Sequence, residues 1–509
     1  MSATGCATGS IRRCAKENRH DDARSRCRPC RRLHLRRAEA RLCDAELTPN
    51  LARFTGTGTW FREARSVFPS MTRVATTSIA TGAPAAVHGV VGNAFLFPQV
   101  TTEHVLDMSR ADDVGLAERV TGGRLVEVET FGDALARAGK RLAVVHTGSA
   151  GSAHLINPRA RAHGHWTFSI FGRDHTQTPE AVDEVIARFG PLPPRTLPRF
   201  EETDYAERVF REHVLAGLDP DVALIWFNEP DTSFHYRFLG SPETLAVLKA
   251  VDAAFGRILA WIDARPDRDR YTVIAASDHG QISTSQDLPL ADLLGAQGHA
   301  TRRGSERTLA GASVAMTGGC MGEIRILEGG VARRDAVARW LLEQDFTGML
   351  FSRGRNAVEG QVSGSLSLSL VGLDHPRAPD LVYVLRSDDG PDAHGRPGLC
   401  LMTEGDVPVG GGMHGGLNRH ELNTVLVARG AGFSAGADDR PCGIIDIAPT
   451  VLAALGLAPL PTMTGEALLG DAPGRAEPGV FEAGLGGFTQ RLIRQERSRS
   501  AILLNGGRV

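Results

Sequence analysis

Apolar residues along the chain gather in short unbroken runs, and these runs alternate with longer segments in which apolar positions recur at helical spacing. The runs at 141–145, 221–227 and 271–277 lack polar alternation, which is typical of parallel strands covered on both faces. Between the last two runs, apolar residues at every third or fourth position predict an amphipathic helix over 243–264. A strand, a helix and a strand in this order indicate a right-handed parallel unit, so we predict an α/β fold.

Three further segments show the pattern of a single helix or strand. The stretch "AELTPNLARF" (45–54) predicts a short helix, and "NTVLVARG" (423–430) has the composition of a buried strand. The stretch "DIAPTVLAALG" (446–456) predicts a helix with Asp446 as its N-cap and Gly456 as its stop.

Glycine and serine become more frequent after about residue 286, and "GQVSGSLSLSL" (360–370) alternates like a half-exposed antiparallel strand. We therefore predict an inserted cap with smaller sheet elements. The predicted parts of the chain are an irregular segment rich in arginine and cysteine at 1–44, a first part of the core at 45–285, the cap at 286–400, a second part of the core at 401–470, and a C-terminal tail at 471–509.

The composition is that of a large globular chain. Of 509 residues, 42% are hydrophobic and 23% are charged, which is ample for a sizeable core. Lysine and arginine number 57 and aspartate and glutamate 59, so the net charge of −2 gives no argument for a nucleic acid or a membrane as a partner. The apolar runs are of strand length, and the first residues lack the apolar region of a secretory signal.

Most cysteines lie in the first 43 residues, which leaves Cys320, Cys400 and Cys442 for the rest of the chain. Such sparse use indicates a reduced, cytoplasmic protein without structural disulfides. The pair Cys27 and Cys30 has no second ligand pair at the spacing of a zinc finger, so we do not expect a metal there.

Metal-ligand residue types stand beside glycine or proline in four separated stretches. These are "FPSMTR" (68–73), "EPDTSFH" (229–235), "SDHG" (277–280) and "GGMHGG" (411–416). Each follows a predicted strand or lies in a glycine-rich loop, and loops at the carboxyl ends of parallel strands converge on one crevice. The four stretches therefore predict a single site at one edge of the sheet.

The residues in these stretches have the makings of a two-metal site. The spacing of four between Asp231 and His235 lets both side chains reach one ion if the segment turns helically. Imidazole with carboxylate suits Zn²⁺ best, with manganese or iron as alternatives, and two such ions can activate a hydroxyl and neutralise phosphate oxygens. The predicted sets are Asp231, His235 and His414 at one ion, and Asp278, His279 and Thr72 at the other.

Together with "TGAPAAVHGVVGN" (81–93) and "GIIDIAPTVLAALGL" (443–457), these stretches resemble the alkaline phosphatase superfamily, specifically its type I phosphodiesterase and nucleotide pyrophosphatase family, over roughly residues 45–470. The resemblance implies an alkaline phosphatase-like core, with a mostly parallel sheet between helices, and an inserted smaller α+β cap. It also implies that Thr72 is a nucleophile that becomes transiently phosphorylated and that the amide of Asn93 steadies a phosphoryl oxygen. The implied metal ligands are Asp231, His235, Asp278, His279 and His414.

Several residues have alternative readings. Ser70 is a rival nucleophile two positions before Thr72, and Asn93 could be a turn residue, because asparagine readily takes a left-handed conformation. The resemblance gives His88 the role of holding its loop. We expect His420, in "LNRHEL", to be a surface helix residue and not a ligand.

The leading functional hypothesis is a metal-dependent phosphodiesterase or nucleotide pyrophosphatase that hydrolyses phosphoester or phosphoanhydride bonds of a small substrate such as a nucleotide. The alternatives are a phosphomonoesterase or phosphonate hydrolase on the same site, because the same ions serve any tetrahedral phosphorus centre. A binding protein with impaired catalysis is a third reading, since one residue implied by the resemblance is missing.

The missing residue is an aspartate. The resemblance implies an early buried strand that ends in Asp-Gly and binds the same ion as the nucleophile, but Arg36 stands there, inside "CRRLHLRRAEARLCD" (30–44). If the reading frame moves forward one base from Cys30, the degenerate codons permit VVVFIFDGLRPDYV over 30–43, with the aspartate in place of Arg36. We therefore predict that 1–44 is a frameshifted reading and that the chain as written lacks a strand and one metal ligand, for which Asp44 is a weaker substitute.

Overall fold

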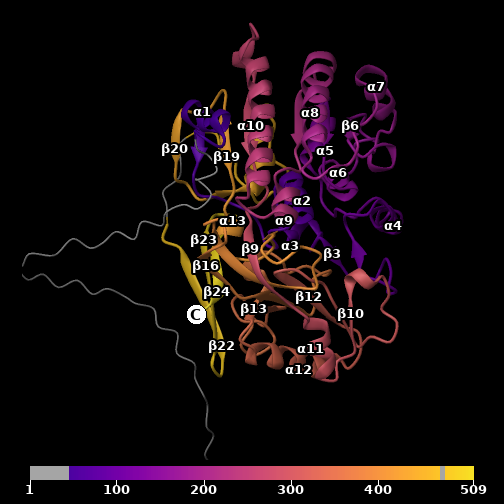
Figure 1. Cartoon of the computed structure of the whole chain (residues 1–509), viewed down its shortest axis with the longest axis vertical. Helices are drawn as coiled ribbons and strands as arrows, with labels where there is room; N and C mark the ends of the chain where they lie inside the picture. The colour runs from indigo at the N-terminus through magenta and orange to yellow at the C-terminus, as the bar shows by residue number, and fades with distance from the viewer. Residues whose placement is uncertain (1–44, 471–475) are drawn as a thin grey trace, which may run out of the picture. The chain divides into compact units, whose positions relative to one another are not determined.

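The computed structural model describes residues 45–470 and 476–509. Helices and strands alternate along most of this length, which confirms the predicted α/β class (Figure 1). The frameshift prediction for residues 1–44 lies outside the described residues. No helix among the described residues combines the length and the apolar character that crossing a membrane requires.

A three-stranded parallel sheet has the order β6-β5-β7, formed by β5 (Leu142–His146), β6 (Trp166–Ser169) and β7 (Val222–Trp226). Val144 of β5 lies opposite Thr167 of β6 and Leu224 of β7. The two faces of this three-stranded sheet are covered by different helices. One cluster joins the sheet to α7 (Glu180–Phe189), α8 (Phe200–Arg208) and α10 (Pro242–Asp263), and another joins it to α2 (Thr72–Thr81), α5 (Phe131–Arg137) and α6 (Ala150–Leu155).

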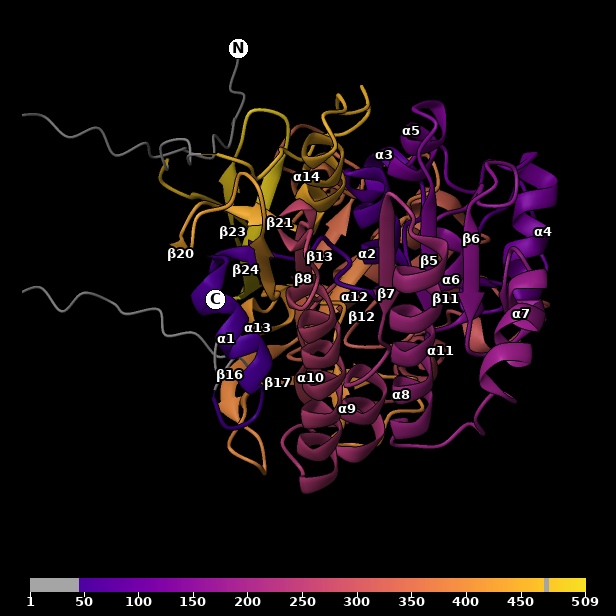
Figure 2. The same cartoon turned by 90° about the horizontal axis from the view of Figure 1, so that it is seen from above.

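A four-stranded sheet has the order β20-β1-β19-β8, formed by β1 (Thr59–Phe61), β8 (Val273–Ala276), β19 (Leu426–Arg429) and β20 (Gly436–Asp438). The strand predicted at 423–430 is β19, and it runs antiparallel to both β1 and β8. The helix predicted at 243–264 is α10, which connects β7 to β8 as expected. Figure 2 shows β6, β5, β7 and β8 in one row, with no described strand pairing between β7 and β8.

The predicted cap region contains a six-stranded sheet of order β10-β11-β12-β15-β13-β14. Its strands are β10 (Thr301–Arg303), β11 (Val314–Met316), β12 (Met321–Ile326), β13 (Thr347–Ser352), β14 (Leu366–Ser367) and β15 (Leu381–Leu385). Helices α11 (Leu290–Ala296) and α12 (Gly330–Glu343) contribute Leu294 and Leu341 to its core. The boundaries of the cap stay a prediction.

The expectation of a half-exposed antiparallel strand at 360–370 is wrong. Only Leu366 and Ser367 form a strand there, and this strand pairs in parallel with β13. Ser363 and Ser369 are exposed, but Ser365 and Ser367 are buried. Their hydroxyls find partners within the protein, and Ser365 Oγ lies 2.7 Å from Ser352 Oγ. A polar residue whose hydrogen bonds are satisfied internally can be buried at little cost.

A fourth sheet, which is mixed and has the order β16-β17-β9-β18, links the cap to the loops that carry the predicted ligands. Its strands are β9 (Ile282–Leu288), β16 (Ser387–Pro391), β17 (Pro397–Thr403) and β18 (Gly412–Met413). Strand β9 begins shortly after His279, and β18 ends directly before His414. The short pairing of β18 with β9, in which Met413 lies opposite Ile282, therefore brings two ligand-bearing segments together.

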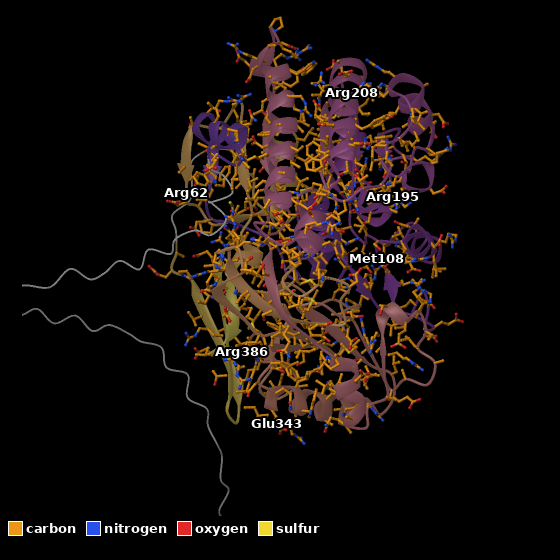
Figure 3. All side chains as sticks on the ribbon, in the orientation of Figure 1. Arg62, Met108, Arg195, Arg208, Glu343 and Arg386 are labelled. Carbon is orange, nitrogen blue, oxygen red and sulfur yellow. The ribbon has the colours of Figure 1, made fainter. Side chains whose placement is uncertain are left out.

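The part of the predicted C-terminal tail that the structure describes is an antiparallel sheet. It consists of β22 (Gly479–Leu485), β23 (Phe488–Glu496) and β24 (Ala501–Arg508). Leu492 and Leu503 from this sheet are buried in the main core cluster. Side chains fill the spaces between the elements throughout the described residues (Figure 3).

The remaining elements are short. The helix predicted at 45–54 is α1 (Pro49–Thr57), and the helix predicted at 446–456 is α14 (Ile447–Ala454). Asp446 precedes α14 as expected, but its carboxylate makes no cap; it accepts hydrogen bonds from Gly443 N and Glu466 N instead. The others are α3 (Ala85–His88), α4 (Ala111–Thr121), α9 (Asp231–Arg237), α13 (Arg419–Leu422), β2 (Ala64–Arg65), β3 (Ala94–Phe95), β4 (Leu106–Asp107) and β21 (Cys442–Gly443).

Candidate active site

Thr72 is the first residue of α2, and the residue before it, Met71, is extended. The side chain of Thr72 is buried, and its Oγ1 lies 3.2 Å from Nε2 of His279. The N-terminus of a helix presents free backbone N–H groups and the positive end of the helix dipole, which together favour an anion. The hydroxyl of Thr72 therefore stands where a phosphoryl group would be stabilised.

Ser70, the rival nucleophile, has its hydroxyl fully engaged. Its Oγ donates to the carbonyl of Gly416 and accepts from the N–H of Gly415, both at 3.0 Å. The Ser70 side chain is completely buried. Ser70 therefore holds the glycine-rich loop. Because its hydroxyl is already bonded, the geometry favours Thr72 as the attacking residue.

Asp231 begins helix α9, directly after the loop that follows β7. One helical turn later, His235 brings its Nε2 to 3.5 Å from Oδ1 of Asp231. His414, from the loop after β18, brings its Nε2 to 3.7 Å from the same oxygen. The three side chains predicted to share an ion thus meet around one carboxylate oxygen.

The imidazoles are oriented as metal ligands require. Nδ1 of His235 lies 2.6 Å from the carbonyl of Gly412, and Nδ1 of His414 lies 2.8 Å from that of Ser70. In each ring Nδ1 donates to a carbonyl, which leaves the lone pair of Nε2 directed at Asp231. A ligating histidine commonly donates its other N–H to such a partner, so these residues fit a divalent ion.

His279 and Asp278 follow β8 and complete the predicted set. Nε2 of His279 lies 3.3 Å from Oδ2 of Asp278, and its ring stacks on that of His414 with centroids 3.6 Å apart. Ligand atoms of Asp231, His279 and His414 all lie within 4.8 Å of one another. His279 thus stands between the two predicted ligand sets, and the division of the ligands between two ions stays a prediction.

Charge and burial shift the pKa values of Asp231 and His414 toward the forms that can bind a metal, whereas the pKa values of Asp278 and His235 are raised. Burial acts to raise the pKa of Asp231, but His235 and His414 outweigh it and hold that pKa well below its usual range. Burial and the neighbouring His279 lower the pKa of His414, which keeps this imidazole neutral. Burial raises the pKa of Asp278, and the negative charge of Asp231 adds to the effect. A cation near Asp278 would favour its ionised form.

Asn93 lies in the loop before β3, and its Oδ1 accepts a hydrogen bond of 3.0 Å from the backbone N–H of Arg73. This contact fixes the orientation of the amide, because the oxygen must face the donor. The NH₂ group is left as a donor beside the N-terminus of α2. The geometry therefore suits an amide that contacts a phosphoryl oxygen better than a simple turn residue.

Two residues of the site were missed by sequence reasoning. Gln281 donates its Nε2 to Oδ1 of Asp231. Arg73 has a buried Nε without a hydrogen-bond partner among the described residues, and the charges of Asp107, Asp231 and Asp278 act on its guanidinium. The sequence indicates these two residues only by their position, because Arg73 follows Thr72 and Gln281 follows "SDHG".

His88 and His420 lie outside the ligand cluster. His88 is buried, its Nε2 lies 3.0 Å from Ser78 Oγ and its Nδ1 accepts from Val90 N, so it holds its loop as the resemblance implied. The expectation of a surface position for His420 is wrong. Its side chain is buried, with Nε2 at 3.2 Å from Oδ1 of Asp389, a partner distant in sequence.

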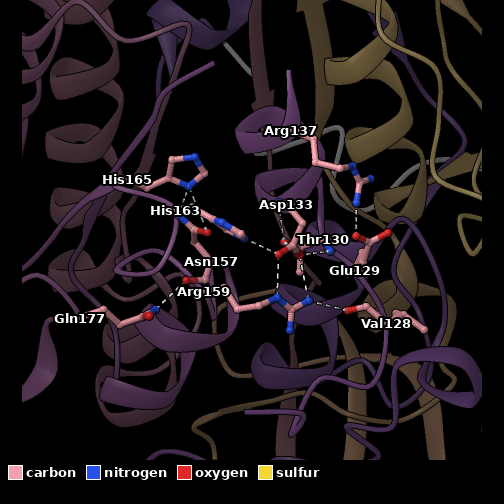
Figure 4. A network of polar contacts seen from close by, with 10 residues as sticks. All are labelled: Val128, Glu129, Thr130, Asp133, Arg137, Asn157, Arg159, His163, His165 and Gln177. Atoms are coloured by element: carbon pink, nitrogen blue, oxygen red, sulfur yellow. Dashed lines mark hydrogen bonds and ion pairs between the residues drawn. The ribbon is translucent and has the colours of Figure 1, made fainter. Parts of the chain in front are cut away.

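A second polar cluster surrounds Asp133 (Figure 4). The carboxylate accepts from the backbone and hydroxyl of Thr130, from two nitrogens of Arg159, and from Nε2 of His163 at 2.7 Å. Burial acts to raise the pKa of Asp133, but these donors together hold it well below its usual range. Because every acceptor position is filled, the cluster caps α5 and ties it to Arg159 without a free group for catalysis.

Known proteins share this fold. A model of the family described as type I phosphodiesterase / nucleotide pyrophosphatase matches residues 38–339. Among solved structures, murine ectonucleotide pyrophosphatase / phosphodiesterase 5, an inactive form of which was determined in complex with AMP, is similar, with a TM-score of 0.55 and 16% identity over 82% of this chain and 92% of that one. Phosphonoacetate hydrolase from Sinorhizobium meliloti, in complex with phosphonoformate, has a TM-score of 0.55 and 19% identity over 82% and 92%.

Proposed function

The chain belongs to the type I phosphodiesterase / nucleotide pyrophosphatase family, a family of metal-dependent hydrolases, and from this premise we propose that it cleaves phosphoester or phosphoanhydride bonds of small substrates through Thr72. The observation that carries the proposal is the position of the Thr72 hydroxyl. It stands at the N-terminus of α2 and 3.2 Å from His279, at the edge of the cluster of candidate ligands.

Each residue has a role that follows from its contacts. The Thr72 hydroxyl gives up its proton and attacks phosphorus, and the bond from phosphorus to the leaving oxygen opposite it breaks, so that the leaving group departs and takes up a proton. Water then cleaves the phosphothreonine ester, which releases the phosphoryl group and restores the hydroxyl. The N–H groups of the first turn of α2 and the amide of Asn93 contact the equatorial oxygens, where charge collects in the transition state. Arg73 adds a positive charge next to this position.

The ions would be held by Asp231, His235, Asp278, His279 and His414, with Zn²⁺ as the first candidate and manganese or iron as alternatives. When bound, two such ions lower the pKa of a hydroxyl and neutralise phosphate oxygens and the leaving group. The orientation of the imidazoles by the carbonyls of Gly412 and Ser70 supports this assignment.

The substrate class has two candidates within the family. A nucleotide-type phosphodiester or pyrophosphate is the first, in line with the family description. A phosphonate is the second, because one similar structure is a phosphonoacetate hydrolase. Arg73 is compatible with both, since AMP and phosphonoformate are both anions that carry a phosphorus group.

The test compares initial rates on bis-nitrophenyl phosphate, nitrophenyl phosphate and phosphonoacetate, with zinc or manganese added. We expect the diester to be the best substrate and Thr72→Ala to remove the activity. A faster monoester or phosphonate reaction would replace the proposed substrate class. A chain that binds two ions per molecule but turns over none of the three substrates would favour a binding protein.

A further inference from the structure

Strands β7 and β8 each have one paired and one unpaired edge. β7 pairs with β5, and β8 pairs with β19. Within 45–470 and 476–509, no strand pairs with the second edge of either. Both strands run toward the candidate site, because Asp231 follows β7 and Asp278 follows β8, and both stand in the row of strands in Figure 2. We call the two unpaired edges together the β7–β8 slot.

The faces of these strands are covered. Ala223 of β7 and Val273 of β8 pack against the core cluster that contains Ile258 of α10, the helix that connects the two strands. Leu224, which points the opposite way, packs against the core cluster that contains Val74 of α2. The slot therefore lies between two apolar layers, and a central strand of an α/β sheet has the same surroundings.

Burial shows that the slot is open along the strand edges. All five residues of β5, which has a partner on each side, are buried. β7 also has five residues and covered faces, yet none of them is buried, and none of the four residues of β8 is buried. Since the faces are covered, the exposure comes through the unpaired edges. Unpaired backbone groups beside apolar side chains form a template for a further strand.

We propose that the β7–β8 slot is filled by a strand of this same protein, encoded by the codons of residues 30–43 read one base forward. That reading is Val-Val-Val-Phe-Ile-Phe-Asp-Gly-Leu-Arg-Pro-Asp-Tyr-Val. It opens with six apolar residues, one more than β7 has, and β-branched and aromatic residues favour a strand. The Asp-Gly pair then ends the strand with a turn.

The residues as written differ in chemical character from the shifted reading. Arg31, Arg32 and Arg36 would bring guanidinium groups between two apolar layers, where an unpaired charge is strongly unfavourable. The genetic code makes a chance agreement of the shifted reading with a strand unlikely. Each shifted codon permits only a few residues, and the codon that begins in Glu39 permits only arginine or lysine. The shifted reading is apolar at every position that the slot must bury.

The chain that follows the proposed strand begins beside the slot. Helix α1 is held on α10 by Asp252, whose carboxylate accepts from the N–H groups of Asn50 and Leu51 at 3.0 and 2.9 Å. Because α10 covers the slot, the segment that leads into α1 need cross only a short distance. A strand parallel to β7 and β8 ends at the edge where Asp231 and Asp278 lie.

The test compares two chains by hydrogen exchange and thermal unfolding in the presence of EDTA, so that it depends neither on a metal nor on turnover. One is the chain as written, and the other carries the shifted reading at 30–43. In the second chain we expect the slot-facing amides of β7 and β8 to exchange at least about 100-fold more slowly and Tm to rise by roughly 5–10 °C. Sequencing of the first 150 bases should show a one-base shift.

The matched control carries the shifted reading with prolines at the second valine and at the isoleucine, which remove strand hydrogen bonds but keep the apolar composition. It should behave like the chain as written. Slot-facing amides that are already protected in the chain as written would overturn the proposal, as would equal protection in the proline control. Protection that appears only at high protein concentration would assign the slot to a second copy instead.

Discussion

At the scale of single residues, two hydroxyls in one turn have different tasks because they face different neighbours. Ser70 points at the loop of Gly415 and Gly416, whereas Thr72 points at His279. Both hydroxyls lie in the same stretch, "FPSMTR", and only the long-range contacts separate their roles.

Thr72→Ala should lower kcat by at least about 1,000-fold, because it removes the nucleophile and no core contact. Metal content, measured by elemental analysis, and Tm should change little. Ser70→Ala is the matched control. It should lower Tm and metal affinity, because it frees the loop that carries His414, while the phosphoryl-enzyme still forms on Thr72. Full turnover in Thr72→Ala would contradict the assignment.

His414→Ala and Asp231→Ala should each weaken metal binding by at least about 100-fold, measured by titration with zinc against a competing chelator. If the division of ligands is right, each variant loses one ion first and keeps the other. His420→Ala, a buried histidine outside the cluster, is the control and should keep both ions. Loss of the same ion in Asp278→Ala and His414→Ala would show that the division is wrong.

Glu323 makes the stability of the protein depend on pH. Burial raises its pKa from 4.5 to about 7, although Arg325 acts in the opposite direction. The folded state therefore holds a proton that the unfolded state releases, and stability falls as pH rises from about 4.5 to 7. Glu323→Gln should remove this loss and be more stable than the natural chain by up to about 3 kcal/mol at pH 8, with little difference at pH 5.

The measurement is urea denaturation of both chains at pH 5, 6, 7 and 8. The glutamine can still accept from Leu96 N, as Oε1 of Glu323 does at 2.8 Å, so the comparison isolates the charge. A stability difference that does not change with pH would exclude the raised pKa as its cause.

At the scale of elements, the strongest sequence signals correspond to real helices and strands. The runs at 141–145, 221–227 and 271–277 are β5, β7 and β8, and the helix at 243–264 is α10. Local periodicity predicts these because each buries one stripe or both faces. It failed at 360–370, because buried serines with internal partners look like an exposed face.

The convergence of several predicted site residues could be expected from the sequence, because Asp231 and His279 stand in loops after β7 and β8 and His414 stands in a glycine-rich loop. Thr72, Asp231, His279 and His414 meet as expected. Arg73 could not be found this way, because an arginine beside a hydroxyl has no spacing rule and its role depends on carboxylates from other elements. Pairing across the cap sheet was also beyond the sequence, since it joins segments far apart in the chain.

Helix α1 depends on a side chain of α10 for its start. Asp252 is buried and accepts from two backbone N–H groups and from Nδ2 of Asn50, whereas Thr48, the N-cap residue of α1, makes no side-chain cap bond. Asp252→Ala should lower stability by about 1–3 kcal/mol, measured by urea denaturation, because it leaves these donors unpaired. Asp252→Asn keeps an acceptor and should lose less. Equal losses in the two variants would mean that packing, not capping, matters there.

At the scale of the whole molecule, the C-terminal sheet is fastened to the core by a buried ion pair. Arg497, after β23, donates to both oxygens of Asp446 at 2.7 and 2.9 Å and pairs with Glu466 at 3.1 Å. Asp446 is completely buried. The last strands of the chain are thus part of the core that supports the helix at 447–454.

Arg497→Met should destabilise the protein by about 3–5 kcal/mol, because it leaves the carboxylate of Asp446 buried without its partner. Thermal unfolding and limited proteolysis measure the effect. Replacing both Arg497 and Asp446 by apolar residues should recover part of the loss. A double variant as unstable as the single one would show that the ion pair is not the source.

The contacts of Ser70 also decide when the site can exist during synthesis. Ser70 O accepts from Nδ1 of His414, 344 positions further along the chain, and its hydroxyl bonds the two glycines that follow. A ribosome makes the Thr72 turn early and the loop that fixes it late. Through most of translation, Thr72 therefore lacks the contacts of Ser70 with the loop of His414. A product that ends at residue 339 would contain the whole sequence that the family model matches, but it would lack His414 and the two glycines.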